Sequence, residues 1–309
     1  MDRTHRSTDA LRPLALSQGL LSRADGSAQF AFGNVAVLAS LTGPAEVRIR
    51  DELVDRATLD IHLRPLRGAG GPPLRSAEST LASLLAPLIL LHLYPRALLQ
   101  LTLQTVSSPS TAFTAPLSTD PLLGAGAEAG GDKNGKGKGK ARGTGAGAAE
   151  KAARINAAVM ALVDGGVQLR GMLVAVAVAV VPVTVSDDDE EELRLDPTPQ
   201  EELASTSTHV FAFSFGQGVG GAEGTCVGVD SVGSFAEDQL FDAQDLAQSA
   251  AQTVLAFIRR SVETKYGVAG APPPAQTRLA GGGAARREEA EEEGSDGDSD
   301  DDDQVMIDA

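Results

Sequence analysis

The sequence lacks tryptophan and contains one cysteine and few aromatic residues. Aromatic residues make up 4% of the 309 residues, whereas hydrophobic residues as a whole make up 42%. A sizeable core is therefore possible, but small and aliphatic side chains must fill it. The lone thiol of Cys226 cannot form an internal disulfide, which favours a reducing compartment.

The sequence also lacks the patterns that mark secreted, membrane, metal and nucleotide-binding proteins. The apolar segment at 84–94, "LLAPLILLHLY", is about half as long as a membrane span requires, so we interpret it as part of a buried helix. The start of the chain is charged and has no signal-peptide core, so we expect a soluble protein. The glycine-rich segment has no Walker pattern. We expect no cofactor and no metal site, since the four histidines are scattered without ligand spacing: His5, His62, His92 and His209.

The negative charge is concentrated in two acidic segments. The formal net charge is −16, of which residues 279–309 contribute −10. Six further acids form the run at 187–192. The rest of the chain is close to neutral, so net charge does not exclude a nucleic-acid partner.

Two segments are predicted to be unstructured. Residues 124–150 hold ten glycines and no large apolar side chain, and the tail at 270–309 is rich in Pro, Gly and acids. Neither can bury enough apolar surface to offset the entropy of ordering. We therefore predict one domain at 9–266, interrupted by the insert at about 124–150 and followed by an acidic tail.

The remaining residues alternate between strand and helix patterns. Two strands, 28–33 and 35–43, are predicted to form a hairpin at Gly33-Asn34. A helix is predicted at 76–94, with Ser76 as N-cap and a kink at Pro87. Further strands are predicted at 57–66, 97–107, 172–181, 192–198, 208–215 and 224–233, and further helices at 151–164 and 242–266. The uninterrupted Val/Ala strand at 172–181 is typical of a strand buried on both faces. Grouped strands with intervening helices indicate an α+β fold.

Three sequence blocks resemble the ribonuclease PH family, and in particular the ring subunits of the eukaryotic RNA exosome. They are residues 11–44, "LRPLALSQGLLSRADGSAQFAFGNVAVLASLTGP", residues 155–171, "INAAVMALVDGGVQLRG", and residues 193–213, which include "LRLDPTPQEE" and "STHVFAF". The resemblance covers about residues 9–266. It implies sheet and helix layers of the topology of ribosomal protein S5 domain 2.

The resemblance also implies partners. Such subunits form heterodimers, and three of these close a hetero-hexameric ring around a channel for single-stranded RNA. Cap proteins lie on the ring, and a separate processive nuclease acts on the RNA. We accordingly expect a location in the nucleus and nucleolus, and also in the cytoplasm, with no membrane association.

Active members of the family cleave RNA with inorganic phosphate, and the sequence departs from their pattern. The family's Gly-Thr-Arg phosphate cradle follows the strand that is here 97–107, where this chain reads "SSPSTAF" at 107–113. Of two expected acids, the first falls on Glu201 or Glu202, and the second falls on "STST" at 205–208. Hydroxyl groups cannot replace an anionic carboxylate near neutral pH. We therefore expect no catalytic residue in this chain.

The candidate RNA contacts are Arg64, Arg67 and Arg75, which flank the loop between a strand and a helix. In the resembling family this loop faces the channel, where guanidinium groups would contact phosphates without sequence preference. Three ordinary surface arginines are an equally good interpretation. Lys133, Lys136, Lys138, Lys140 and Arg142 could form a cationic arm, but a passive insert is the favoured interpretation.

Three functions remain open from the sequence. The leading one is a non-catalytic structural subunit of the exosome ring, supporting 3′-to-5′ RNA processing and degradation. The second is an active phosphate-dependent 3′-to-5′ exoribonuclease, with a phosphate cradle supplied by a partner. The third is an unrelated α+β binding protein.

Overall fold

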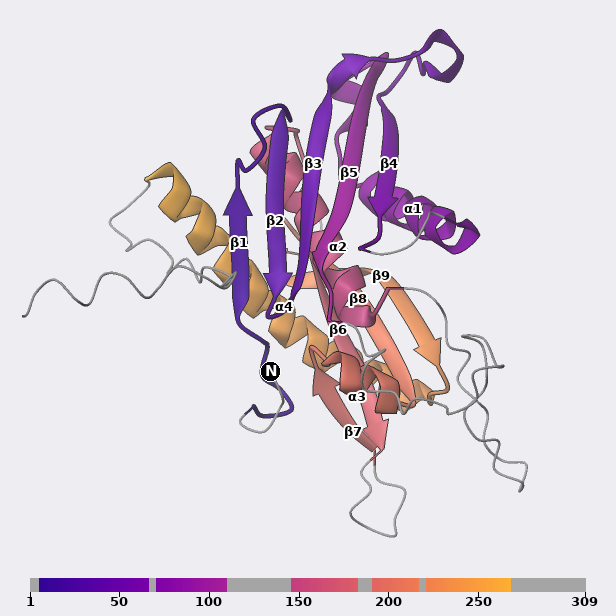
Figure 1. Ribbon diagram of the computed structural model, residues 1–309, viewed down its shortest axis with the longest axis vertical. Coiled ribbons are helices and arrows are strands. Elements are labelled where there is room, and N and C mark those ends of the chain that lie inside the picture. Colours follow the sequence, from indigo (N-terminus) through magenta and orange to yellow (C-terminus); the bar gives the residue numbers. More distant parts are fainter. Residues whose placement is uncertain (1–5, 67–70, 110–145, 183–190, 217–220, 268–309) are drawn as a thin grey trace, which may run out of the picture. The chain divides into compact units, whose positions relative to one another are not determined.

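The computed structural model describes residues 6–66, 71–109, 146–182, 191–216 and 221–267. All of these lie in one compact unit, residues 1–274. They form two β-sheets with helices between and beside them (Figure 1). No helix within these ranges is long and apolar enough to cross a membrane. The Lys/Gly insert and the acidic tail fall almost wholly outside the described residues, as does most of the acidic run at 187–192.

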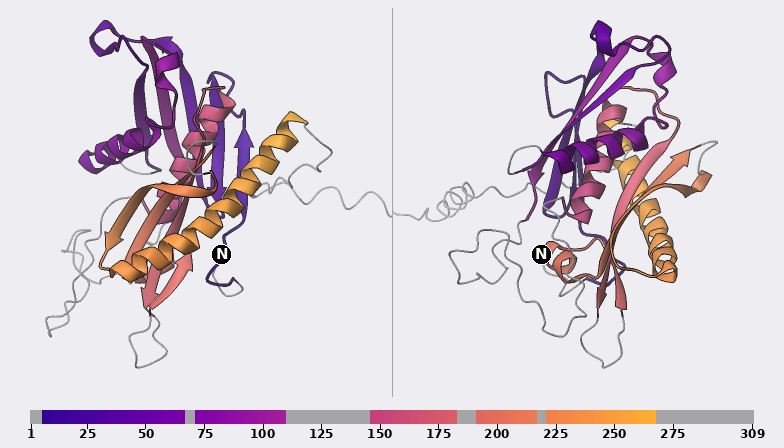
Figure 2. Two further views of the ribbon diagram at one scale, coloured as in Figure 1. Left: turned by 180° about the vertical axis from the view of Figure 1, so that it is seen from behind. Right: turned by 90° about the vertical axis from the view of Figure 1, so that its right-hand side faces the viewer.

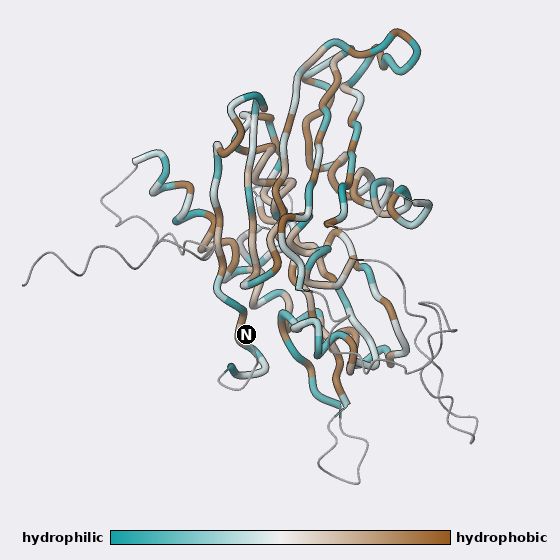
Figure 3. The backbone as a smooth tube through the Cα atoms, viewed as in Figure 1, coloured by the Kyte–Doolittle hydropathy of each residue, from teal (hydrophilic) through white to brown (hydrophobic). Residues whose placement is uncertain are grey.

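The first sheet has five strands in the order β1-β2-β3-β5-β4. Its strands are β1 (Leu14–Gln18), β2 (Gly26–Phe32), β3 (Val35–Glu46), β4 (Thr58–Arg64) and β5 (Ala97–Ser107). All neighbours are antiparallel except β4 and β5, which are parallel. The predicted hairpin is confirmed, because Phe32 pairs with Val35 and Gly33 takes a positive φ of 54° between them. Figure 3 shows hydrophobic and hydrophilic residues alternating along β4 and β5, as expected when one face meets the core.

The second sheet has four antiparallel strands in the order β7-β6-β8-β9. Its strands are β6 (Met172–Pro182), β7 (Glu191–Leu195), β8 (Ser207–Gly216) and β9 (Gly221–Gly233). The prediction for the Val/Ala strand is confirmed, because every residue of β6 from Leu173 to Val181 is buried.

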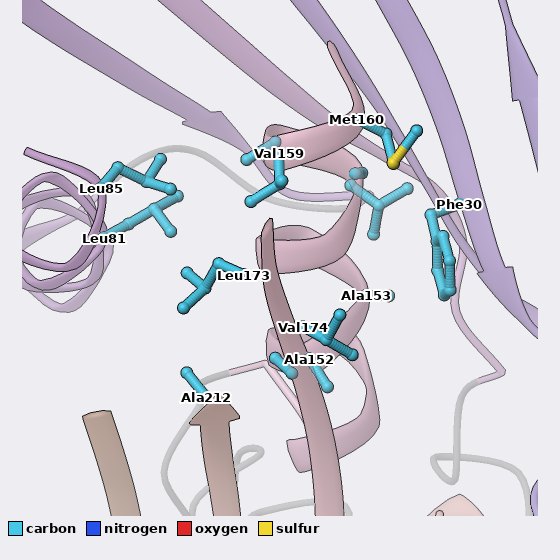
Figure 4. Close-up of a cluster of buried hydrophobic side chains, with 14 of the residues drawn as sticks. Phe30, Leu81, Leu85, Ala152, Ala153, Val159, Met160, Leu173, Val174 and Ala212 are labelled. Atoms are coloured by element: carbon cyan, nitrogen blue, oxygen red, sulfur yellow. The ribbon is translucent and has the colours of Figure 1, made fainter. Parts of the chain in front are cut away.

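Helix α2 (Ala148–Asp164) lies between the two sheets and packs against β2, β3 and β6. Its alanines, among them Ala152 and Ala153, allow this close approach (Figure 4). Asn156, which is fully buried, donates to the carbonyl of Ala175 on β6 (2.9 Å) and accepts from its N–H (2.8 Å). Those two backbone atoms lie at the part of β6 where β7 does not reach, so Asn156 replaces the missing strand partner.

Helix α4 (Glu237–Tyr266) packs on the second sheet against β6 and β8, as the view from behind in Figure 2 shows. Its buried positions are mostly alanines, and they include Ala243, Ala247 and Ala251. The predicted amphipathic helix at 242–266 is therefore confirmed, and it begins five residues earlier than predicted.

Three further predicted boundaries were wrong. Helix α1 (Pro72–Leu85) begins at Pro72-Pro73, because proline fits the first helical turn, and Gly71 rather than Ser76 is its N-cap. Pro87 ends the helix instead of kinking it, and the chain continues as a short 3₁₀ turn at Leu91–Leu93. Helix α2 begins at Ala148, inside the segment predicted to be an unstructured insert. Strand β1 and the short helix α3 (Pro199–Ala204) were not predicted.

Candidate functional site

The end of β5 and the start of α2 meet in space, although 40 residues separate them in the sequence. Glu150, in the first turn of α2, accepts hydrogen bonds from the hydroxyls of Thr105 (2.7 Å) and Ser108 (3.1 Å). Arg154, one turn further along α2, donates to the same carboxylate at 2.5 Å. Both Glu150 and Arg154 are buried. In the resembling family the phosphate cradle follows the strand that is here β5, so an anion site in this chain would be expected at this junction.

The carboxylate of Glu202 occupies the N-terminus of α2. Its Oε1 accepts a hydrogen bond from the backbone N–H of Ala149 at 3.1 Å. A Cβ added at Gly147, the N-cap of α2, would lie 2.4 Å from Glu202 Oε2, so the carboxylate and the helix start are in close contact. A helix N-terminus, with its free N–H groups and positive dipole end, is a natural anion site. Here that site holds a side chain of the protein itself.

Burial raises the pKa of the Glu202 carboxyl above its ordinary value. The N–H groups of Ala149 and Ala148 and the charge of Arg12 oppose this shift, while the charge of Asp196 adds to it. The environment therefore stabilises the neutral acid more than water does, although donors surround the carboxylate.

Glu201, the other candidate for the first family acid, points elsewhere. It forms a capping box with Thr198 at the start of α3, and its carboxylate lies 3.2 Å from Arg194 Nη1 and 3.9 Å from Arg6 Nη2. Sequence reasoning left Glu201 and Glu202 as equal alternatives. The structure places Glu202, and not Glu201, at the start of α2.

The position predicted for the second acid, 205–208, holds hydroxyl side chains at the start of β8. Ser207 Oγ lies 3.0 Å from His209 Nε2, and His209 Nδ1 lies 2.8 Å from Ser231 Oγ. His209 and Ser207 are fully buried, and the ring of Phe235 packs edge-on against the imidazole. These side chains satisfy one another's hydrogen bonds, and none of them is a carboxylate.

Lys151 and Asp230 join α2 to β9 beside this cluster. Lys151 Nζ lies 2.8 Å from Asp230 Oδ2, and both side chains are partly exposed. Sequence reasoning missed this pair, together with Glu150 and Arg154. Glu150 falls in the segment predicted to be an insert, and the contact between Lys151 and Asp230 joins residues 79 positions apart. The i,i+4 spacing of Glu150 and Arg154 is a helix signal that could have found them.

Two of the three candidate RNA-binding arginines lie within the described residues. Arg64 is the last residue of β4 and Arg75 is in the first turn of α1, and both are exposed. Neither forms an ion pair with any described residue. The carboxylate of Glu78 accepts the N–H of Leu63 at 2.8 Å, which fixes α1 against β4 and so brings the two ends of the loop to one side of the sheet. Arg67 lies outside the described residues, as do the cations of the insert.

The segment at 107–113, where the family has its phosphate cradle, lies partly outside the described residues. Ser107 and Ser108 of the segment at 107–113 are described, and its remainder from residue 110 is not. No group of three or more His, Cys, Asp or Glu side chains in the described ranges is arranged to hold a metal ion.

Comparison with known proteins identifies the family. A model described as the 3′ exoribonuclease family, domain 1, matches residues 10–168. "Exosome complex component RRP46" of Saccharomyces cerevisiae is 31% identical over 245 residues, covering 79% of this chain and 93% of the relative. "Exosome complex component rrp46" of Schizosaccharomyces pombe is 28% identical over 51% of this chain and 54% of the relative.

A solved structure agrees on the fold. The crystal structure of rice Rrp46 superposes with a TM-score of 0.62 at 23% sequence identity, covering 82% of this chain and 96% of that chain. The names of these proteins agree with the resemblance of the three sequence blocks to exosome ring subunits, and specifically to ribosomal RNA-processing protein 46. The family match and the extent of the yeast alignment together show that the chain belongs to the RNase PH family of 3′ exoribonucleases.

Proposed function

We propose that this chain is a non-catalytic structural subunit of the RNA exosome ring. In this role it supports 3′-to-5′ RNA processing and degradation by lining a channel through which single-stranded RNA reaches a separate nuclease. The names of the curated relatives support membership of an exosome complex together with other RNase PH-like subunits. Family membership removes the third alternative, an unrelated binding protein whose likeness is accidental.

The arrangement at the start of α2 is the observation that supports inactivity. An incoming phosphate dianion would have to compete with the carboxylate of Glu202 for the N–H of Ala149. A second carboxylate, that of Glu150, lies in the first turn of the same helix and is already paired with Arg154. Glu202 thus competes directly for the helix start, whereas the charge of Glu150 is balanced by Arg154, which leaves that guanidinium engaged. The short hydroxyl side chains at 205–208 provide no anionic group for the chemistry at the scissile bond.

The test of inactivity measures nucleoside diphosphates released from a 3′-tailed single-stranded RNA by the purified full chain in inorganic phosphate. We expect no release above the level without protein. Glu202→Ala and Glu201→Ala are the matched pair of variants, because only Glu202 contacts the start of α2. Phosphate-dependent release that Glu202→Ala abolishes and Glu201→Ala leaves intact would favour the alternative, an active phosphorolytic exoribonuclease.

For the RNA channel, we propose that Arg64, Arg67 and Arg75 contact the phosphates of the RNA. The exposure of Arg64 and Arg75, and the absence of ion pairs with described residues, leaves both guanidinium groups available. Changing all three to Glu in a reconstituted ring is expected to reduce RNA crosslinking to this subunit at least tenfold. The control changes three other exposed arginines, Arg23, Arg259 and Arg260, to Glu. Equal crosslinking in the two triple variants would exclude these residues as a channel contact.

The partners and location follow from the same proposal. Stoichiometric co-purification with other RNase PH-like subunits and with cap proteins is expected, in a complex whose native mass fits a ring. Imaging of the tagged full chain is expected to place it in the nucleus and nucleolus and in the cytoplasm. Because residues 124–145 contain no large apolar side chain that a folded core would need, their deletion should leave assembly intact, and loss of the complex on deletion would contradict the passive interpretation of the insert.

A further inference from the structure

The outer edge of β9 is unpaired within the described part of the chain. β9 is the last strand of the second sheet and pairs with β8 alone. A strand edge with free N–H and C=O groups is a template for another strand, and proteins normally protect such edges with lysine or proline. β9 has neither residue. Its pairing with β8 is irregular at Val227 and again between Gly221 and Thr225, which leaves residues 228–232 as a regular run against β8.

Large apolar side chains lie exposed beside this edge. Ala212 of β8 points into the cluster between the two sheets (Figure 4), so its neighbour Phe211 points to the opposite face, where α4 lies. Val229 of β9 pairs with Phe211 and therefore lies on the same α4 face of the sheet. Gln248 of α4 donates to the carbonyl of Glu223 on β9 at 3.1 Å, so α4 runs alongside the strand. The exposed fractions are 43% for Val227, 48% for Val229, 39% for Phe235 and 53% for Phe241.

The rim of this apolar patch carries charge of one sign. Its acids are all exposed, and they are Glu223, Glu237, Asp238, Asp242 and Asp245. α4 contains no basic residue before Arg259, and β9 contains none. Lys151 is paired with Asp230 and approaches β9 from the α2 side. The patch therefore complements a positively charged partner and repels nucleic acid.

We propose that this edge and patch, which we call the β9 surface, bind an extended segment of another protein chain that has alternating apolar side chains flanked by Lys or Arg. The segment would add as a fifth strand along residues 228–232. Its backbone would form hydrogen bonds with the free edge, its apolar side chains would cover Val229 and Phe241, and its cations would meet the acids of α4. This use of the chain is separate from the RNA-facing loop of α1.

The direct test titrates the full-length chain with a fluorescent 12-residue peptide in which Val and Thr alternate between terminal Lys-Arg pairs. Binding is expected, whereas a peptide with Glu-Asp pairs at its ends is expected to bind at least tenfold more weakly. Asp242→Lys with Asp245→Lys should weaken binding of the basic peptide at least tenfold. Glu52→Lys with Asp55→Lys, an equal charge change on the β3–β4 connection, is the control and should change it less than twofold.

Hydrogen exchange of the complex locates the binding. Added protection is expected at alternate amides of residues 228–232, and Val229→Lys, at an exposed position, should remove it. Equal binding of the two peptides, equal effects of the two charge-reversal pairs, or protection elsewhere would each overturn the proposal. None of these results depends on whether the chain is catalytically active or part of a ring.

Discussion

A double-mutant cycle between Gly147 and Glu202 tests the arrangement that underlies the proposed inactivity. Gly147 has φ −62° and ψ 161°, which alanine adopts without strain, so Gly147→Ala introduces only a methyl group. That methyl would lie 2.4 Å from Glu202 Oε2. The end of the Glu side chain can move, but only by leaving the N–H of Ala149.

The expected cost follows from the hydrogen bond that is displaced. A hydrogen bond to a charged group contributes about 1.5–3 kcal/mol, and returning the carboxylate to water recovers part of this. Gly147→Ala should therefore reduce the free energy of unfolding by about 1–3 kcal/mol in the otherwise unchanged chain. In a Glu202→Ala background there is no carboxylate to displace. The weaker N-cap preference of alanine and the reduced entropy of the unfolded chain then nearly cancel, leaving a change within about 0.5 kcal/mol of zero.

The assay is urea unfolding of the four proteins, followed by far-ultraviolet circular dichroism because the chain has no tryptophan to report by fluorescence. Equal m-values across the four proteins would show that the folded and unfolded states expose the same surface. A coupling energy of about 1–3 kcal/mol is expected between sites in contact. If Gly147→Ala reduced stability equally in both backgrounds, Glu202 would not occupy the α2 N-terminus and the argument against a phosphate site there would fail.

Three further predictions concern the elements that position this site. Asn156→Ala leaves the buried N–H and C=O of Ala175 without their side-chain partner, and should lower the free energy of unfolding measured in urea by about 2–5 kcal/mol. A loss under about 1 kcal/mol would show that water replaces the amide. Gly26→Ala places a Cβ 2.4 Å from a backbone oxygen of α2, and neither backbone segment can move aside without disturbing the core. The change should lower the free energy of unfolding by about 3 kcal/mol or prevent folding, and a normal melting temperature would refute this close approach. For Glu202 the pKa is raised in the folded state above the ordinary 4.5, so its stabilising effect is complete below that value and is lost as the pH rises through the folded pKa. The stability of the unchanged chain relative to Glu202→Gln should therefore fall as the pH rises above 4.5, and a difference that stayed constant or rose would contradict the shift.

Much of the fold could be predicted because its signals are local. The alternating pattern of β5 and the uninterrupted Val/Ala pattern of β6 gave both strands to within a residue at each end. The helix boundaries were less reliable, because the preference of Pro72 for a first helical turn competes with the N-cap preference of Ser76 four residues later. The short helix α3 has too few residues to show a period, and its Thr198 and Glu201 capping box was the usable signal.

For the candidate site, the sequence could predict only which family residues are absent. The sequence showed that no carboxylate stands at 205–208, since that depends on residue identity alone. It could not show which of Glu201 and Glu202 faces α2, because neighbouring residues on a short helix point in different directions and only the packing of α3 selects one.

The sequence by itself determined the family, the order of the strands from β2 onward and of the main helices, the concentration of negative charge, and the absence of a second family acid. Each of these is a property of residue identity or of a short repeating pattern. The tertiary structure alone decided that a carboxylate from α3 closes the start of α2, 53 residues before it, and that among the described strands β9 pairs on one side only, beside an acidic helix. Both depend on which distant segments pack together, and packing is fixed by the burial of the whole core rather than by any local pattern.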